Sequence, residues 1–316
     1  MKNNNIPQLD LSDFTSGDAS RKGQFVRKLG KAYEEIGFVA IKNHGLDEDM
    51  RRELYDEVHK FFALPVDVKM KYEIPGLAGQ RGYTSFGKEH AKDHNSGDLK
   101  EFWQFGQYVK KNSENIEDYP KNVSVEELPS FNPVAMRIYT TLEDTGREIL
   151  KAISLYLDLE EDYFEDKVKH GNSILRAIHY PPITKDPGEA VRSAAHEDIN
   201  LITLLMGASA AGLQVLNKQN EWISVTALPE HIIVNVGDML QRLTNNRLRS
   251  TTHRVVNPPK EKWSEPRYSI PFFLHPISEM DLSCLENCVD DEHPRLYDNI
   301  SAGDYLNERL AEIGLK

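Results

Sequence analysis

Two histidines and one aspartate are the residues of this chain whose types and spacing suit a metal ion. His196 and Asp198 stand two apart at the start of an apolar run over residues 199–205, and His253 lies in a second β-like run over 251–256. Side chains two apart in an extended segment point to the same side, so His196 and Asp198 can converge on one point. Two imidazoles and a carboxylate bind a divalent first-row metal and leave one face of it open. The H-x-D spacing alone also occurs by chance at solvated strand starts.

Arg267 and Ser269 form a second pair, on one face of an apolar run over residues 266–274. A guanidinium that faces into a barrel is costly unless an anion meets it, and its planar fork suits a carboxylate. That anion can be an Asp or Glu of the protein, and the arginine can also extend to solvent at a strand end. Beside a three-ligand metal set, an external carboxylate ligand becomes the better interpretation.

These residues belong to a series of motifs that resembles the non-haem iron(II), 2-oxoglutarate-dependent oxygenases of the isopenicillin N synthase-like family. In the second half of the chain, the resemblance is carried by His196-Glu197-Asp198, by residues 212–215, 234–238 and 250–255, and by Arg267-Tyr268-Ser269. In the first half, it is carried by residues 6–11, 37–38, 43–45 and 81–83. The motifs cover nearly the whole chain, and the combination is specific although each part is weak by itself.

The resemblance implies an iron(II) site and an oxidation reaction. The iron would be held by His196, Asp198 and His253, with positions left for the keto acid and for O2. The enzyme would hydroxylate, desaturate or cyclise a small-molecule substrate, which the sequence does not identify, and would release succinate and CO2.

The resemblance also implies a site for 2-oxoglutarate. Arg267 and Ser269 would hold its distal carboxylate, and Tyr180 matches a family tyrosine near this cosubstrate. Arg176 is expected to contact the cosubstrate as well, because it shares the strand face of Ile178, which stands where many relatives have Asn. One cosubstrate contact would therefore be missing or replaced.

The elements that must position these residues differ between the two halves of the chain. In the first half, apolar residues at helical spacing predict helices over 25–36, over 46–61 and after Pro133, with a short strand at 38–41. Residues 74–98 show no period and are expected to form a surface loop.

The second half predicts a β structure. Short runs of β-branched and apolar residues recur between turn signals, at 173–180, 199–206, 213–216, 222–225, 232–236, 251–256 and 268–274. A parallel sheet would need a helix between successive strands, and these gaps are too short. We therefore expect a sandwich or barrel closed mostly by antiparallel pairs. A last helix is expected over 302–313, with Ser301 as its N-cap.

The expected fold is thus α+β with a mainly β core, which the resemblance implies to be a double-stranded β-helix, or jelly roll. We expect three parts: a mostly helical N-terminal region over residues 1–170, the core over 171–280, and a C-terminal extension with a helix over 281–316. The substrate would enter at a barrel mouth shaped by residues 74–108 and 276–316.

The composition of the chain indicates which classes of partner are excluded and which cellular compartment is expected. The 316-residue chain has 38 Lys and Arg against 50 Asp and Glu, a net charge of −12, which argues against nucleic acid and membrane partners because both require a basic surface. No stretch approaches the ~18 apolar residues of a membrane helix, and the first residues lack a signal-peptide core. Two cysteines, Cys284 and Cys288, cannot form a disulfide framework. We expect a cytoplasmic protein, and a monomer is compatible with the sequence.

Three other functions remain open on the sequence alone. An iron oxidase of the same family can work without 2-oxoglutarate and carries the same R-x-S motif. Catalytic zinc also takes two histidines and a carboxylate, but a zinc hydrolase would leave the R-x-S motif unexplained. A barrel that binds a ligand without catalysis would not need the full ligand set.

The remaining histidines and one aromatic cluster are less informative. We expect surface or structural roles for His44, His59, His90, His94, His170, His231 and His293. His179 and His275 lie on expected core strands, so packing and support of the metal site are both open for them. Phe102, Trp103 and Phe105 are expected either to line the substrate pocket or to pack in the core.

Overall fold

The structure of this protein, a computed structural model, contains twelve strands in the part of the chain that it describes, which is residues 6–77, 79–89, 97–108, 119–207, 211–225, 228 and 230–312. The strands are β1 (Gln8–Asp10), β2 (Phe38–Lys42), β3 (Gly82–Thr84), β4 (Glu101–Gly106), β5 (Ile174–Tyr180), β6 (Ser193–His196), β7 (Ile202–Met206), β8 (Leu213–Leu216), β9 (Trp222–Ser224), β10 (Ile232–Val236), β11 (His253–Val255) and β12 (Arg267–Leu274).

Helices lie before, between and after these strands. They are α1 (Leu11–Thr15), α2 (Ala19–Glu35), α3 (Glu48–Phe62), α4 (Val66–Met70), α5 (Phe131–Tyr156), α6 (Glu165–Val168), α7 (Asp238–Leu243) and α8 (Ala302–Glu312), with short 3-10 turns at Lys260–Lys262 and Glu286–Cys288. Within the described residues, no helix is long and apolar enough to cross a lipid bilayer.

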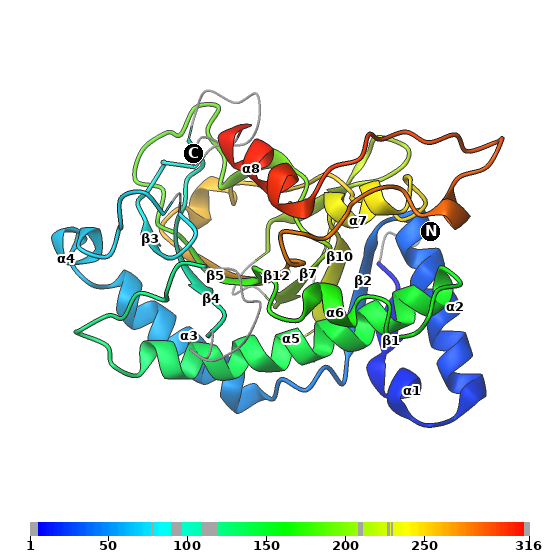
Figure 1. The fold of residues 1–316 in the computed structure, drawn as a ribbon. Helices are drawn as coiled ribbons and strands as arrows, with labels where there is room; N and C mark the ends of the chain where they lie inside the picture. Colours follow the sequence, from blue (N-terminus) through cyan, green and yellow to red (C-terminus); the bar gives the residue numbers. More distant parts are fainter. Residues whose placement is uncertain are drawn as a thin grey trace.

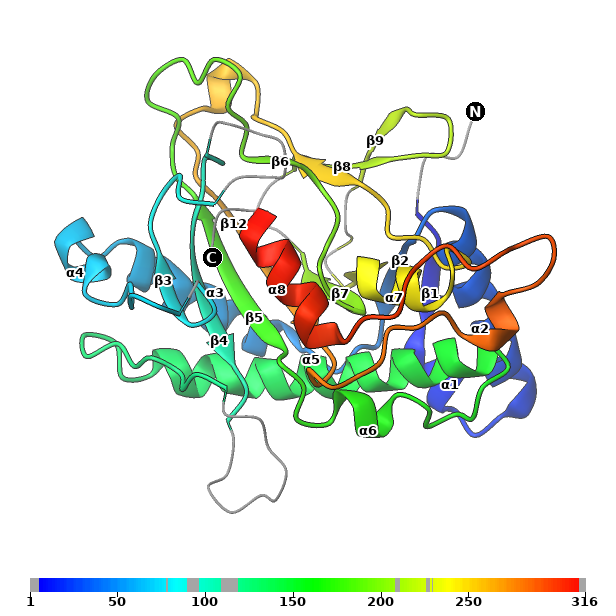
Figure 2. The ribbon, with the colours of Figure 1, turned by 45° about the horizontal axis from the view of Figure 1, so that its top comes forward.

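The strands form two sheets that enclose a cavity. The larger sheet has the order β1-β2-β10-β7-β12-β5-β4-β3, and the smaller one has the order β6-β11-β8-β9. Figure 2 shows the smaller sheet above the larger one, and strands of both sheets line the same cavity. Except for the parallel pair of β1 and β2, the pairs between described strands are antiparallel. This is the jelly-roll arrangement, and the predicted fold is confirmed.

The larger sheet separates the cavity from a core that it shares with the helices. Side chains alternate between the two faces of a strand. On β12, Ile270 and Phe272 are therefore buried in the core, whereas Ser269 and Phe273 line the cavity. The long helix α5 covers the outer face of this sheet (Figure 1), and its Tyr139 ring meets Phe272 edge-on at 5.0 Å between centroids.

A glycine allows α5 to come close to the sheet. A Cβ atom at Gly146 would lie 2.4 Å from a methyl group of Leu274 on β12. A larger residue at this position would therefore require the Leu274 side chain to shift.

Most of the elements expected from the sequence are present. The helices expected over 25–36, over 46–61 and after Pro133 are α2, α3 and α5, and the β-like runs of the second half correspond to β5 and β7 to β12. The hydroxyl of Ser301 accepts the backbone N–H of Asp304 at 3.1 Å, which is the expected N-cap of α8.

Other local expectations were wrong. Residues 82–84 of the expected surface loop form β3, beside Arg81, whose side chain is buried; residues 78 and 90–96, with His90 and His94, lie outside the described residues. For the aromatic cluster the sequence leaves both alternatives open, and the structure has core packing: Trp103 and Phe105 pack in the core from β4 and do not line the cavity. Phe102 packs in a small cluster with Ile178 and Tyr180.

The local structure around the H-x-D motif also differs from the expected one. His196 ends a short strand of its own, β6, and Asp198 lies in the connection to β7, which begins only at Ile202. The connection is held by side chains, because Asn200 donates to the hydroxyl of Thr203 at 2.8 Å. Polar side chains that bond locally compete with the strand ladder and delay its start.

The three-part division of the chain stays a prediction. The N-terminal region contributes strands to the same sheet as the core, since β2 pairs with β10 and β4 pairs with β5.

The first testable prediction concerns Glu143 on α5. Burial raises the pKa of this carboxyl to about 7, although Arg147 acts in the opposite direction. An unfolded glutamate titrates near ~4.3. The folded state therefore binds the proton more tightly, and the stability that this proton confers is lost as the pH rises toward 7. Glu143→Gln should gain stability over the parent protein between about pH 5 and pH 8 in urea unfolding.

A neighbouring residue supplies the control for this prediction. Asp144 follows Glu143 on the exposed face of α5, and Asp144→Asn should show no such trend. A difference between Glu143→Gln and the parent that does not change with pH would contradict the prediction.

Candidate metal centre

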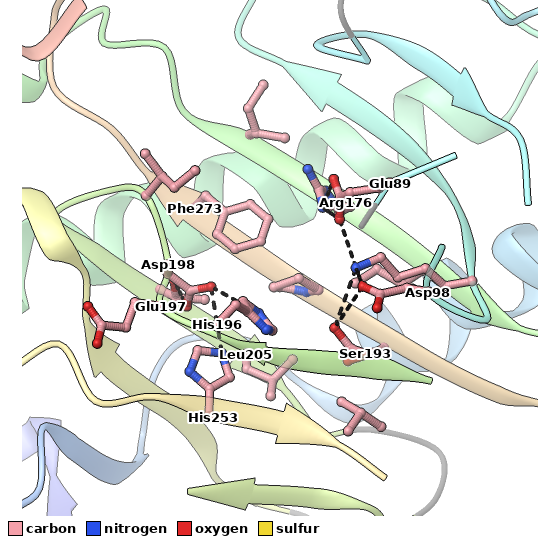
Figure 3. Close-up of a pocket in the computed structure, with 18 of the residues that line it drawn as sticks. Glu89, Asp98, Arg176, Ser193, His196, Glu197, Asp198, Leu205, His253 and Phe273 are labelled. Atoms are coloured by element: carbon pink, nitrogen blue, oxygen red, sulfur yellow. Dashed lines mark hydrogen bonds and ion pairs between the residues drawn. The ribbon is translucent and has the colours of Figure 1, made fainter. Parts of the chain in front are cut away.

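His196, Asp198 and His253 lie together between the two sheets (Figure 3). His253 on β11 is the cross-strand partner of His196 on β6, so strand pairing places the two imidazoles side by side, with ring centroids 4.4 Å apart. Asp198 Oδ1 lies 3.9 Å from His196 Nε2 and 3.6 Å from His253 Nε2. These distances are too long for hydrogen bonds. The three atoms face one another across a gap that a cation would bridge.

The other ring nitrogen of each histidine is bound to the backbone. His196 Nδ1 lies 2.7 Å from the carbonyl oxygen of Ala194, and His253 Nδ1 lies 3.1 Å from that of Thr251. A carbonyl only accepts hydrogen bonds, so each Nδ1 carries the proton. Each Nε2 therefore presents its lone pair toward Asp198, as a metal ligand must.

The second carboxylate oxygen of Asp198 is bound by two neutral donors. Asp198 Oδ2 accepts the hydroxyl of Thr203 at 2.6 Å and the side-chain amide of Asn235 at 2.8 Å. These bonds leave Oδ1 to face the histidines. Sequence reasoning did not assign a role to Thr203 or Asn235, and the available signal was a polar residue inside each of two otherwise apolar strands, β7 and β10.

The pKa values of His196 and Asp198 agree with metal binding. Burial and the neighbouring His253 lower the pKa of His196 to about 4, so this ring is neutral at pH 7. Burial alone would raise the pKa of Asp198, but His253 and His196, with the bonds from Asn235 and Thr203, hold it below its usual value. Neutral imidazole and ionised carboxylate are the forms that bind a metal. The donor set therefore fits a divalent first-row ion with open positions.

The metal centre opens into a cavity with a volume of about 160 Å³. One end is lined by Arg267, Ser269 and Tyr180. Arg267 is 1% exposed and is the cross-strand partner of Tyr180, with its guanidinium carbon 5.0 Å from the tyrosine ring centre. Burial and the charge of Arg267 lower the pKa of a second buried guanidinium nearby, that of Arg192. Arg267 is thus a buried cation in the cavity wall, with a second guanidinium nearby, and this local positive charge favours an anion beside Arg267.

Arg176 lies on the same face of β5 as Tyr180 but has partners within the protein. Its Nη1 pairs with Glu89 at 3.1 Å, and its Nε donates to Gln104 at 2.9 Å. Arg176 and Lys100 hold the pKa of the buried Glu89 carboxyl at about 2, against the effect of burial. The cosubstrate role predicted for Arg176 stays a prediction, while the structure places this arginine in an ion-paired wall of the cavity.

Helix α8, the red helix of Figures 1 and 2, also contributes to the cavity wall. Its Leu306 and Leu310 line the cavity, and its Tyr305 hydroxyl donates to Asp238 on α7 at 2.9 Å. Burial raises the pKa of Asp238 to about 7, although the bond from Tyr305 acts in the opposite direction.

The remaining histidines separate into two groups. His275 lines the cavity, where burial lowers its pKa to about 4. His179 does not line it, because its ring bonds Glu101 at 2.7 Å on the other face of β5. The described histidines with expected surface or structural roles are likewise outside the cavity lining: His44, His59, His170, His231 and His293.

Comparison with known proteins identifies the family. Residues 6–127 match the model described as non-haem dioxygenase in morphine synthesis N-terminal, and residues 171–276 match the 2OG-Fe(II) oxygenase superfamily. The chain is 30% identical over 325 residues to the 2-oxoglutarate-dependent dioxygenase htyE of Aspergillus rugulosus, covering 96% of this chain and 98% of the relative. The chain belongs to the 2OG-Fe(II) oxygenase superfamily. It is therefore an oxidoreductase that requires iron(II), 2-oxoglutarate and O2, and the family prediction is confirmed.

Solved structures agree with this assignment. A Caulobacter crescentus protein assigned to the 2OG-Fe(II) oxygenase family is 42% identical, with a TM-score of 0.86 and coverage of 98% of this oxygenase and 99% of that chain. A full-length Neurospora crassa protein in complex with alpha-KG (2-oxoglutarate) is 30% identical, with a TM-score of 0.86 and coverage of 98% and 97%. The same Neurospora crassa protein has also been solved with alpha-KG and thymine together.

The second prediction concerns the support of Asp198. Thr203→Val keeps the shape of the side chain but removes the hydroxyl that binds Oδ2, so the carboxylate should rotate more freely. Loss of such an outer partner typically weakens metal binding by about 10–100-fold. Anaerobic titration with iron(II) measures this change. Thr84→Val, at a buried threonine of β3 that does not line the cavity, is the matched control and should bind like the parent. Equal weakening in both variants would point to a general packing defect.

Proposed function

We propose that His196, Asp198 and His253 hold the iron(II) of this oxygenase. The observation that carries the proposal is that two lone pairs and one carboxylate oxygen face a common point, while the remaining polar atoms of these side chains are bound within the protein. When bound, iron with 2-oxoglutarate and O2 supplies the oxidant. The chain contributes neutral imidazoles, a fixed carboxylate and a cavity that limits the access of water.

We further propose that Arg267, Ser269 and Tyr180 hold the distal carboxylate of 2-oxoglutarate. A buried guanidinium binds a carboxylate through two parallel hydrogen bonds, which fixes its orientation as well as its position. Arg267 and Ser269 are two apart on β12 and line the same cavity as the three proposed metal ligands, so an anion bound by them can extend toward the metal. The stacking of Arg267 on Tyr180 keeps the guanidinium plane in place.

The proposed substrate is a small molecule and not a nucleic acid. The cavity is small, about 160 Å³, and a net charge of −12 argues against a polynucleotide, whose phosphates require a basic surface. The wall of Arg176, Glu89 and Lys100 has both donors and acceptors and is held by ion pairs. Because the similar Neurospora crassa protein binds thymine, pyrimidine bases are a rational first panel for succinate-release assays.

A further part of the proposal concerns the compartment. We propose that the enzyme works in the cytoplasm. The two cysteines, Cys284 and Cys288, are too few for a disulfide framework, as is usual for proteins of a reducing compartment.

The third prediction tests the metal ligands. Asp198→Ala, His196→Ala and His253→Ala should each abolish tight iron(II) binding and substrate-dependent succinate release, because each removes a ligand. The far-UV circular dichroism should stay close to that of the parent, since these residues face a cavity. Asp49→Ala, at an exposed carboxylate of α3, is the control. An Asp198→Ala protein that binds iron(II) and turns over like the parent would show that the ligand assignment is wrong.

The fourth prediction tests the cosubstrate site. Arg267→Ala should leave iron(II) binding nearly unchanged but weaken 2-oxoglutarate by about 30-fold to several thousand-fold, the equivalent of ~2–5 kcal/mol. Arg267→Lys should recover part of the affinity, because an ammonium cannot form both parallel bonds. Ser269→Ala removes one bond to a charged group, worth roughly 1.5–3 kcal/mol, and should be no more harmful than the lysine variant.

Isothermal titration of 2-oxoglutarate into the anaerobic iron(II) protein measures this series. Equal affinity in the parent and in Arg267→Ala would mean that the arginine serves the protein itself and not the cosubstrate. Substrate oxidation that proceeds without added 2-oxoglutarate would instead indicate the oxidase reaction of the family.

A further inference from the structure

The strand that carries His196 lies at the edge of its sheet. In the order β6-β11-β8-β9, β6 has a strand neighbour on one side only. An edge strand has backbone groups that no ladder satisfies. By contrast, His253 lies on β11, which is held between β6 and β8. The two proposed histidine ligands therefore differ in how firmly their backbone is fixed by the sheet.

Side chains bind both backbone polar groups of Ala194 on β6. Its carbonyl accepts Nδ1–H of His196 at 2.7 Å, and its N–H donates to Asp98 Oδ1 at 3.0 Å. Asp98 thus orients the Ala194 backbone through its N–H, and the Ala194 carbonyl in turn orients the imidazole of His196. A carboxylate that accepts a backbone N–H forms a charge-assisted bond, which is stronger than a neutral one.

Asp98 is itself held rigidly. It is 4% exposed, and its Oδ2 accepts Lys100 Nζ at 2.7 Å (Figure 3). Lys100 also pairs with Glu89 at 2.7 Å, and Glu89 with Arg176. A backbone hydrogen bond also joins the segment of Asp98 to the segment of β6. The N–H of Leu99 donates to the carbonyl of Val191, just before β6, at 2.9 Å. A chain of buried charges therefore connects β5 to the free edge of β6.

We propose that Asp98 is a positioning residue for the iron ligand His196. Its carboxylate fixes the Ala194 backbone, whose carbonyl in turn fixes the tautomer and the tilt of the imidazole. The inference depends on the proposed function, because it takes His196 to be an iron ligand. The sequence gives no hint of this role, since Asp98 stands far from the H-x-D motif along the chain.

The test compares iron(II) affinity in three variants with intact chains. Asp98→Ala removes the acceptor for Ala194, and we expect iron(II) to bind roughly tenfold more weakly, at the lower end of the effect of partners that contact a ligand directly. Asp98→Asn can keep one oxygen toward the Ala194 N–H but turns an amide N–H₂ toward Lys100, so its loss should be smaller. The control is Glu101→Gln, which breaks the buried ion pair between Glu101 and Lys69. Glu101 lies on the face of β4 that points away from the cavity.

A spectroscopic readout separates positioning from general destabilisation. In the cobalt(II)-loaded protein, the Nδ1–H protons of the two metal-bound histidines give separate hyperfine-shifted NMR signals that exchange with solvent. Both Asp98 variants should shift one of these signals and speed its exchange, and leave the other, from His253, near its parent position. Glu101→Gln should change neither signal, even where urea unfolding shows that it is less stable than the parent.

The outcomes divide cleanly. Parent-like iron(II) affinity and parent-like NMR signals in both Asp98 variants would overturn the inference, and so would an equal loss of affinity in Glu101→Gln. If Asp98→Ala does not fold, Asp98→Asn and its NMR signal still decide. If His196→Ala binds iron(II) as tightly as the parent, the ligand assignment itself fails. If His196→Ala loses the metal but both Asp98 variants bind it like the parent, the ligand assignment stands and only the positioning role of Asp98 is refuted.

Discussion

Three electron-rich atoms that face one another without a hydrogen bond are the constraint on which this structure depends. Asp198 Oδ1 and the Nε2 atoms of His196 and His253 all present lone pairs to the same gap. Such an arrangement is unfavourable unless a cation lies between the atoms, because the carboxylate is buried and ionised. Other bonds in the fold enforce it: two backbone carbonyls hold the rings, and Thr203 and Asn235 hold the carboxylate. Folding thus stores an unfavourable contact that metal binding relieves.

This constraint also explains why the site joins both sheets. The histidines lie on the smaller sheet, and the donors to Asp198 lie on β7 and β10 of the larger one. A ligand that binds only the folded state stabilises it in proportion to its affinity and concentration. An ion on the proposed ligands would therefore oppose separation of the two sheets, and the loaded protein should resist unfolding more than the empty one.

The sequence predicted the residues that face the cavity more completely than the residues that hold them in place. Strand periodicity predicted a sandwich or barrel, and the resemblance carried by the motifs of His196, Asp198, His253 and Arg267 implied the jelly roll and the residues that now face one cavity. Thr203 and Asn235 were missed because one buried polar residue in an apolar strand has many possible explanations. Asp98 and Glu89 were missed for another reason: their partners, Ala194 and Arg176, are distant in sequence, and only the folded sheet order brings them together. The loop around residue 82 was misjudged because β3 is three residues long, too short to show a period.

Helix α8 contributes Leu306 and Leu310 to the cavity from a segment outside the strands that hold the metal and cosubstrate sites. The contact surface for the substrate and the machinery of oxidation are therefore encoded in separate stretches of the gene. Mutations in the stretch for residues 302–312 can reshape one wall of the cavity while the strands that carry the chemistry remain under their own selection. A change at Leu306 or Leu310 would therefore alter the shape of the cavity without altering any residue of the proposed metal and cosubstrate sites.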